Sequence, residues 1–172
     1  NDMNRARSIL FSFVPYRVSS FTNLHLAAMA GFGNCIKVLI RNGADVNARE
    51  RARMYTPLHM AVKRGDASVV DVLIDHGAEV DARAEYNTTA LHMAAERGHV
   101  DVVKVLIQNG ADVNAVQKDK KTALHWAAEY GHVDVVKVLI QNGADVNAVG
   151  ENERTALHYA AKNGHVDVVK VL

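Results

Sequence analysis

The chain is poor in cysteine, with Cys35 the only one among its 172 residues. No internal disulfide can form, which excludes the small secreted scaffolds that depend on disulfide bonds. A lone cysteine suits a reducing compartment. We therefore expect an intracellular protein of the cytoplasm or the nucleus.

Long hydrophobic runs and leader-like segments are also missing. No apolar stretch approaches the ~18 residues that a membrane-spanning helix needs, so no membrane insertion is expected. The chain begins with Asn1 rather than Met, and nothing near its start has the pattern of a signal peptide. We expect a fragment of a larger protein.

Motifs that carry chemistry are scarce. Neither glycine-rich phosphate loop, Gly-x-Gly-x-x-Gly or Gly-x-x-x-x-Gly-Lys, occurs. Of the nine histidines, pairs such as His92 and His99 recur seven residues apart, but a glycine separates them and no cysteine pair accompanies them, so they do not predict a zinc site. Cys35 lies in an apolar stripe, as a core residue would. The sequence predicts no catalytic, cofactor-binding or metal-binding residue, and no enzyme activity.

What the chain does contain is a five-fold internal repeat. The tetrapeptide Thr-x-Leu-His starts at Thr22, Thr56, Thr89, Thr122 and Thr155. The spacing is 34 residues once and 33 residues three times, and residues 98–116 recur letter for letter as 131–149. A fixed period of this size predicts stacked supersecondary units rather than one globular core.

Each unit reads as two short helices. Thr122 is a good N-cap for a first helix over 123–130, and Gly131 is typical of a helix end. A second helix is predicted over 133–141, and Asn142-Gly143 ends it. Its buried stripe is expected to comprise Val135, Val136, Leu139 and Ile140. Ala127 and Ala128 are small enough for neighbouring first helices to approach closely.

The unit resembles the ankyrin repeat. The resemblance rests on the 33-residue period, the Thr-Pro-Leu-His opening at 56–59, the glycine after the first helix, and Gly-Ala-Asp-Val-Asn at 143–147. It covers residues 22–172. It implies an all-α solenoid of stacked helix-turn-helix units with protruding β-hairpin or loop fingers. It also implies that the motif histidines are structural and form a buried ladder: His25, His59, His92, His125 and His158.

Both ends depart from the repeat. We expect residues 1–21 to form a separate cap-like segment, a short helix plus a loop, before the repeat domain at 22–172. The alternative is the remnant of a degenerate sixth repeat. At the other end the last repeat stops at Leu172, inside its second helix. We expect that the natural protein continues there or that another molecule covers this end.

The fingers depart as well. The family usually has glycine two residues before the Thr, where this chain has Met54, Asn87, Lys120 and Glu153. Residues other than glycine and asparagine adopt a left-handed turn at a cost of ~1 kcal/mol. We therefore predict altered turns that use Asp119 or Asn152 instead. The first finger, residues 48–55, has one extra residue and three arginines, and we expect it to be bulged or mobile.

The resemblance also places a binding surface. Partners of ankyrin repeats usually dock on the concave face, made of finger tips and the exposed side of the first helices. The corresponding positions vary here while the rest of the repeat is nearly constant. The candidate partner-binding residues are Arg53, Tyr55, Lys63, Arg64, Met93, Glu96, Arg97, Lys121, Trp126, Glu129, Tyr130, Arg154, Tyr159 and Lys162. Trp126, Tyr130 and Tyr159 are expected to form an aromatic cluster. The alternative for these aromatic residues is packing between first helices.

These observations predict a non-catalytic module that binds a protein partner, as a monomeric domain of a larger intracellular protein. The extreme internal duplication is also similar to ankyrin proteins that intracellular bacteria direct into the host cytoplasm. One alternative is the substrate-recruiting arm of an enzyme whose catalytic domain lies outside this chain.

Charge supports a second alternative. Residues 1–64 hold ten Lys and Arg against three Asp and Glu, although the net charge of the chain is only +1. This basic half could steer an acidic partner or bind nucleic acid. Nucleic acid is the weaker reading, because nothing resembles a groove-binding motif. A further resemblance leaves open whether Asn47, Asn114 and Asn147 are hydroxylated, as such asparagines are in this family.

Overall fold

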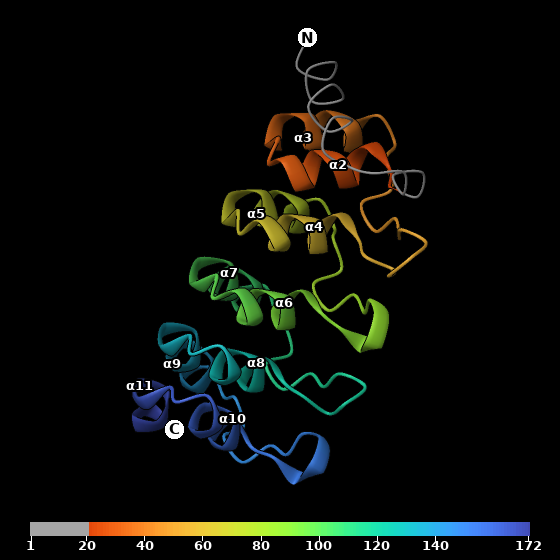
Figure 1. The fold of residues 1–172 in the computed structure, drawn as a ribbon. Helices are drawn as coiled ribbons and strands as arrows, with labels where there is room; N and C mark the ends of the chain where they lie inside the picture. Colours follow the sequence, from red (N-terminus) through yellow and green to blue (C-terminus); the bar gives the residue numbers. More distant parts are fainter. Residues whose placement is uncertain (1–20) are drawn as a thin grey trace. The chain divides into compact units, whose positions relative to one another are not determined.

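A computed structural model describes residues 21–172 (Figure 1). The cap-like segment expected over 1–21 lies outside the described residues, apart from Phe21. The chain divides into two compact units, residues 1–79 and 80–172, and each is described by itself. Residues 21–172 form helices and loops without a β-strand. The fingers are therefore loops rather than hairpins of paired strands.

The described part of the first unit, residues 21–79, contains two helical hairpins. Helix α2 packs against α3 within one repeat, and α4 packs against α5 within the next. The two repeats meet first helix on first helix (α2 on α4) and second helix on second helix (α3 on α5). The bounds are α2 Asn23–Ala30, α3 Gly33–Arg41, α4 Pro57–Arg64 and α5 Ala67–Asp75.

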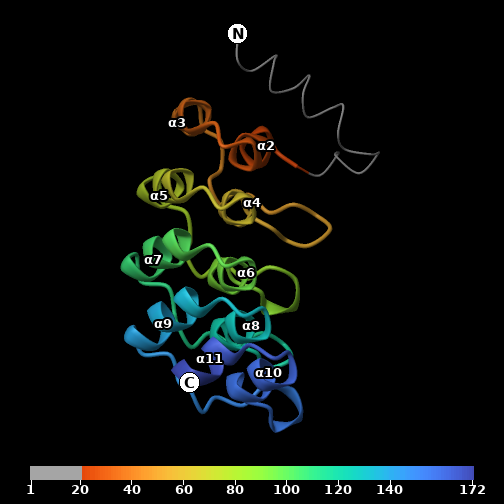
Figure 2. The same ribbon diagram turned by 60° about the vertical axis from the view of Figure 1, so that its left-hand side comes forward.

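The second unit contains three repeats in the same arrangement. Its helices are α6 Ala90–Arg97, α7 Val100–Gln108, α8 Ala123–Glu129, α9 Val133–Gln141, α10 Ala156–Lys162 and α11 Val166–Val171. The first helices α6, α8 and α10 pack in a row, and so do the second helices α7, α9 and α11. The fingers of this unit lie on the side of the first helices away from the second helices, and the turned view agrees (Figure 2).

The predicted repeat is confirmed closely. Helix α9 has the predicted bounds, and α8 ends at Glu129, one residue earlier than expected. In the predicted stripe of α9, Val135, Val136 and Leu139 are fully buried, and Ile140 is half-buried. Ala127 and Ala128 are also fully buried. The apolar face of this fourth helix pair is therefore covered by its neighbours, which is how a repeat that is too small for its own core becomes stable.

Each first helix begins with the same threonine–histidine capping box. In the fourth repeat the Thr122 N–H donates to His125 Nδ1 over 3.1 Å, and the Thr122 hydroxyl lies 2.9 Å from the same nitrogen. Since Nδ1 accepts the backbone proton, the ring's own proton belongs on Nε2. His125 Nε2 then donates to the Arg154 carbonyl of the following finger, 3.1 Å away. His92 makes the same bond to Lys121, at 3.2 Å.

The buried histidine ladder is confirmed for four of its five members. His25, His59, His92 and His125 are buried, whereas His158 is exposed. His158 keeps its capping bonds to Thr155. Within residues 21–172, no later finger lies over its ring.

Glycine is required where the first helices of the second unit end. Gly98 and Gly131 have φ of +72° and +76°, in the left-handed region. A Cβ atom at Gly98 would lie 2.6 Å from the His132 ring, and one at Gly131 would lie 2.6 Å from the His165 ring. These rings donate through Nε2 to the carbonyls of Glu96 and Glu129, at 3.0 and 2.9 Å. Glycine therefore allows both the left-handed turn and the close approach of the histidine ring from the next repeat.

The prediction of altered finger turns is wrong. Met54, Asn87, Lys120 and Glu153 all keep the left-handed conformation, with φ between +57° and +61°. Asn152 is left-handed in addition to Glu153 rather than in its place, and Tyr86 likewise precedes Asn87, within the 3₁₀ turns η3 (Glu151–Glu153) and η2 (Glu85–Asn87). Asp119 instead accepts the Lys121 N–H on its side chain at 3.2 Å. Hydrogen bonds across each finger hold the turn despite its residue type.

The first finger is bulged, as expected. Its closing bond runs from the Glu50 N–H to the Tyr55 carbonyl and spans one residue more than the bonds that close the other fingers, such as Gln117 N–H to the Lys121 carbonyl. The extra residue is thus absorbed in a wider turn.

The left-handed turns yield a stability prediction. Lys120→Gly should be about 1 kcal/mol more stable than Lys120→Ala, because alanine pays the left-handed strain and glycine does not. Urea unfolding measures the difference. Lys118, in the same finger, does not have a positive φ. There the order should reverse, with Lys118→Gly less stable than Lys118→Ala. The same order at both positions would contradict the assigned turn.

The histidine ladder makes stability depend on pH. Burial lowers the pKa of His92 to about 4, although the hydrogen bond to the Lys121 carbonyl opposes the shift. Burial likewise lowers the pKa of His25 and His125. The unfolded chain therefore binds protons at a higher pH than the folded chain. Stability is complete above pH ~6.5 and falls towards pH ~4, by about 3 kcal/mol from His92 alone.

Unfolding free energies at about pH 7.5 and pH 5 test this expectation. His92→Gln is the control variant, since glutamine can cap the helix but does not titrate in this range. We expect its stability to fall less than that of the wild type on acidification. An equal fall in both proteins would refute the role of His92.

Candidate protein-interaction surface

The fingers of the second unit are joined by backbone hydrogen bonds. The Lys118 N–H donates to the Tyr86 carbonyl, and the Glu151 N–H donates to the Asp119 carbonyl, both at 2.9 Å. Each finger is also closed on itself, for example from the Gly150 N–H to the Arg154 carbonyl at 2.9 Å. His92 and His125 also bond to the second and third of these fingers, at Lys121 and Arg154. The three fingers 84–88, 117–121 and 150–154 therefore form one connected row.

An aromatic row crosses α8 beside these fingers. The rings of Trp126 and Tyr130 stack at 6.2 Å, and those of Tyr130 and His132 stack at 6.3 Å. Trp126 Nε1 donates to the Gln117 side chain at 2.7 Å, and Gln117 donates in turn to the Thr88 hydroxyl at 2.8 Å. At the other end His132 donates to the Glu96 carbonyl. The aromatic row Trp126–Tyr130–His132 is thus fixed at both ends by the preceding repeat and its finger.

Lys121 ties the middle finger to this row. Its Nζ lies 4.2 Å from the centroid of the Trp126 ring, 4.8 Å from that of Tyr159, and 2.9 Å from the Glu129 carboxylate. The Lys121 side chain is only 13% exposed, so water screens these interactions weakly. A cation held by two rings and a carboxylate fixes the finger against α8 and α10.

The structure divides the predicted site residues between the two units. Arg53, Tyr55, Lys63 and Arg64 belong to the first unit, and the other ten belong to the second. The exposed ones are Arg53, Lys63, Arg64, Arg97, Tyr130, Arg154 and Lys162; the half-buried ones are Tyr55, Glu96, Lys121, Trp126 and Glu129. Met93 and Tyr159 are buried.

Of the expected aromatic cluster, Trp126 and Tyr130 stack on each other, and the three side chains differ in exposure. Tyr130 is 50% exposed, Trp126 is half-buried, and Tyr159 is 7% exposed. Tyr159 packs edge-on against His125, with the ring centroids 5.7 Å apart. Burial therefore favours the packing alternative for Tyr159. Met93, which occupies the equivalent position in the third repeat, is also buried. Neither is included in the surface proposed below.

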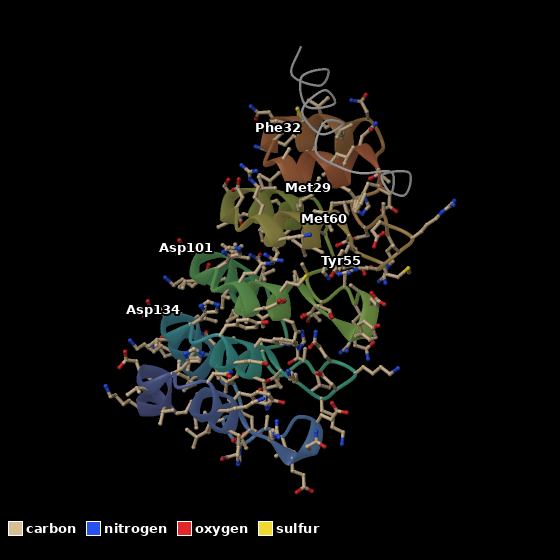
Figure 3. All side chains as sticks on the ribbon, viewed as in Figure 1. Met29, Phe32, Tyr55, Met60, Asp101 and Asp134 are labelled. Atoms are coloured by element: carbon tan, nitrogen blue, oxygen red, sulfur yellow. The ribbon has the colours of Figure 1, made fainter. Side chains whose placement is uncertain are left out.

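In the first unit, Tyr55 and Arg64 have structural partners. The Tyr55 ring stacks on His59 at 5.5 Å, and its carbonyl accepts from His25 Nε2 at 2.8 Å. The Arg64 guanidinium lies 3.8 Å from Asp66 and covers Gly31. Figure 3 labels Tyr55, the last residue of the first finger, and Met60 on α4.

Sequence reasoning missed two residues of this surface. Gln117 connects a finger to the single tryptophan, and its position holds Ala84 and Gly150 in the neighbouring repeats. Tyr86 is 63% exposed at a finger tip, in a left-handed conformation that is unusual for an aromatic residue. The one signal in the sequence was that Gln117 and Tyr86 each differ in residue type from the residues at the equivalent position of the other repeats.

The asparagines that resemble hydroxylation sites are engaged in links between successive loops. Asn47 donates to the Gly77 carbonyl at 3.0 Å and accepts the Glu79 N–H at 2.9 Å. Asn114 makes the same pair of bonds to Gly143 and Asp145, both at 2.9 Å. Both side chains therefore have a structural role, and their modification stays a prediction.

The described residues offer little for other chemistry. Within 21–172, no group of three or more His, Cys, Asp and Glu side chains is arranged to hold a metal ion. None of the helices in this part of the chain combines the length and apolar character needed to cross a bilayer. Cys35 is half-buried.

The link through Gln117 can be tested with the chain's only tryptophan. Gln117→Ala removes the acceptor of the Trp126 N–H, so the indole should become more mobile and its fluorescence emission should shift to the red. The free energy of unfolding should fall by about 1 kcal/mol. Lys118→Ala, an exposed change in the same finger, is the control and should leave the emission unchanged. Identical spectra for Gln117→Ala and wild type would contradict the link.

Comparison with known families agrees with the geometry. A family model for ankyrin repeats in three copies matches residues 24–117, and a second ankyrin repeat model, for many copies, matches residues 124–172. No curated protein matches the chain. Since the first match alone covers more than half of the chain, the protein belongs to the ankyrin repeat family, an all-α solenoid whose repeats are generally protein–protein interaction modules and typically non-catalytic.

Proposed function

We propose that the second unit binds a protein partner through its first-helix face, which comprises the exposed sides of α6, α8 and α10 and the fingers 84–88, 117–121 and 150–154. The observation that carries the proposal is the aromatic row Trp126–Tyr130–His132. It is fixed by hydrogen bonds at both ends and leaves Tyr130 half exposed.

A fixed, exposed aromatic residue is suited to binding. Tyrosine and tryptophan dominate the energetics of protein interfaces because they bury large areas with few rotatable bonds. Here the stacking and the Gln117 and Glu96 bonds restrict the rings before any partner arrives. Binding to such a surface loses little conformational entropy. The exposed cations Arg97, Arg154 and Lys162 provide a polar rim.

Comparison of the repeats supports the same face. The second helices α9 and α11 share the sequence Val-Asp-Val-Val-Lys-Val over the length of α11. On the first helices, however, Trp126 becomes Tyr159 and Tyr130 becomes Asn163. Variation confined to one face of a constant scaffold is expected if that face determines which partner binds.

The setting of this interaction is part of the proposal. We infer a domain of a larger protein that binds as a monomer. An intracellular location is supported by the lone cysteine, which suits a reducing compartment. Delivery by a bacterium into a host cell, or recruitment of substrate for a catalytic domain elsewhere, would use the same face. The identity of the captured partner distinguishes these roles.

The test replaces the aromatic pair with residues that the chain itself uses. Trp126→Met with Tyr130→Asn installs the counterparts from the third and fifth repeats, so the fold should be retained. We expect affinity for a partner captured by the wild type to fall about ten-fold or more, as for loss of an interface hot spot. The measurement is affinity capture followed by titration of the purified partner.

The control variant lies on the opposite side of the unit. Lys104→Ala with Lys137→Ala alters the exposed outer surface of α7 and α9, where Asp101 and Asp134 also lie (Figure 3). It should bind like the wild type. Partner binding that survives the aromatic change and is lost in the outer variant would overturn the proposed face.

A further inference from the structure

The loop at residues 48–55 has a composition unlike that of the other fingers. Arg49, Arg51 and Arg53 alternate along it, and all three are exposed. The side chain of Met54 is also 44% exposed beside them. The loop thus combines three guanidinium groups with one apolar side chain on a single turn.

A buried carboxylate shapes this loop. Glu50 is 2% exposed, and its side chain accepts backbone N–H groups from Ala52 at 2.7 Å, from Arg53, and from Tyr55 at 3.4 Å. Its backbone closes the turn as well, accepting from the Met54 N–H at 3.1 Å. Other fingers have Ala84, Gln117 or Gly150 at the equivalent position. Glu50 therefore orders the backbone from which the arginines project.

Among the described residues of the first unit, 21–79, the excess of positive charge lies in this loop. Elsewhere in residues 21–79 the chain holds four Lys and Arg against five Asp and Glu. A long polyanion such as nucleic acid would extend beyond the loop onto the rest of residues 21–79, whose formal charge is slightly negative. A short anionic segment would meet the three arginines alone.

We propose that the 48–55 loop binds a short acidic peptide segment, with the arginines pairing with Asp or Glu carboxylates. The guanidinium fork matches a carboxylate in two parallel hydrogen bonds, and an ordered loop holds several forks in place. This site belongs to the first unit alone. It does not require the first-helix face of the second unit to bind anything.

The test uses the full chain and a short fluorescein-labelled peptide of Glu, Asp and Gly, followed by fluorescence anisotropy. The wild type should bind saturably and release the peptide as salt rises. Arg49→Ala with Arg51→Ala and Arg53→Ala should bind about ten-fold more weakly or worse. Replacement of all three by lysine keeps the charge but loses the fork, and it should give an intermediate affinity.

The control removes the same charge elsewhere. Lys104→Ala with Lys137→Ala and Lys170→Ala alters exposed lysines on the outer helices and should bind like the wild type. An equal loss in this control, no saturable binding to the wild type, or tighter binding of a single-stranded oligodeoxythymidine would overturn the proposal.

Glu50→Gln tests the ordering of the loop. If net charge alone determined the affinity, removing this negative charge would tighten binding of an acidic peptide. Because glutamine keeps only one of the two oxygens that accept the backbone N–H groups of the loop, we expect weaker binding instead, with helix content unchanged by circular dichroism. Affinity equal to or above that of the wild type would overturn the ordered loop as the binding site.

Discussion

The structure depends on a neutral histidine held between a helix start and the next finger. In each motif Nδ1 accepts from the capping threonine, and in His25, His92 and His125 the Nε2 atom is bonded to a carbonyl of the following finger. One side chain thereby satisfies a helix end and fixes the loop of the next repeat. Because the ring is buried and both nitrogens are used, the charged form is disfavoured. Local capping and long-range stacking are therefore the same interaction, which is why the motif recurs with the period of the repeat.

This link determines which side chains are held in place for binding. With the fingers held by the histidines and by backbone bonds such as that from Lys118 to Tyr86, side chains that project from them start from a fixed frame. In the second unit the frame supports Trp126 and Tyr130, and in the first unit Glu50 gives the 48–55 loop a frame of its own. The two proposed contacts differ in chemistry, one aromatic and one cationic, and both use surfaces that are ordered before binding.

The repeat itself could be predicted from sequence because residues within each repeat specify its helices. Thr122, Gly131 and the valine stripe of α9 specify caps and a buried face without reference to other repeats. The finger turns could not be predicted. Residue preference argued against a left-handed Lys120 or Glu153, but the hydrogen bonds that close each finger outweigh that preference. The roles of Gln117 and Glu50 were also hidden, because each depends on partners brought together only by folding. Tyr159 and Met93 are residue types common at protein interfaces, yet both lie in the core.

The tautomeric state of His92 and His125 tests the histidine link most directly. A long-range proton–nitrogen correlation spectrum of the imidazole rings distinguishes protonation at Nε2 from protonation at Nδ1. The account predicts that both rings are neutral at neutral pH, with the proton on Nε2, and that His92 stays neutral well below the ordinary histidine pKa. A proton on Nδ1, or a doubly protonated ring just below that pKa, would contradict the link between helix start and finger.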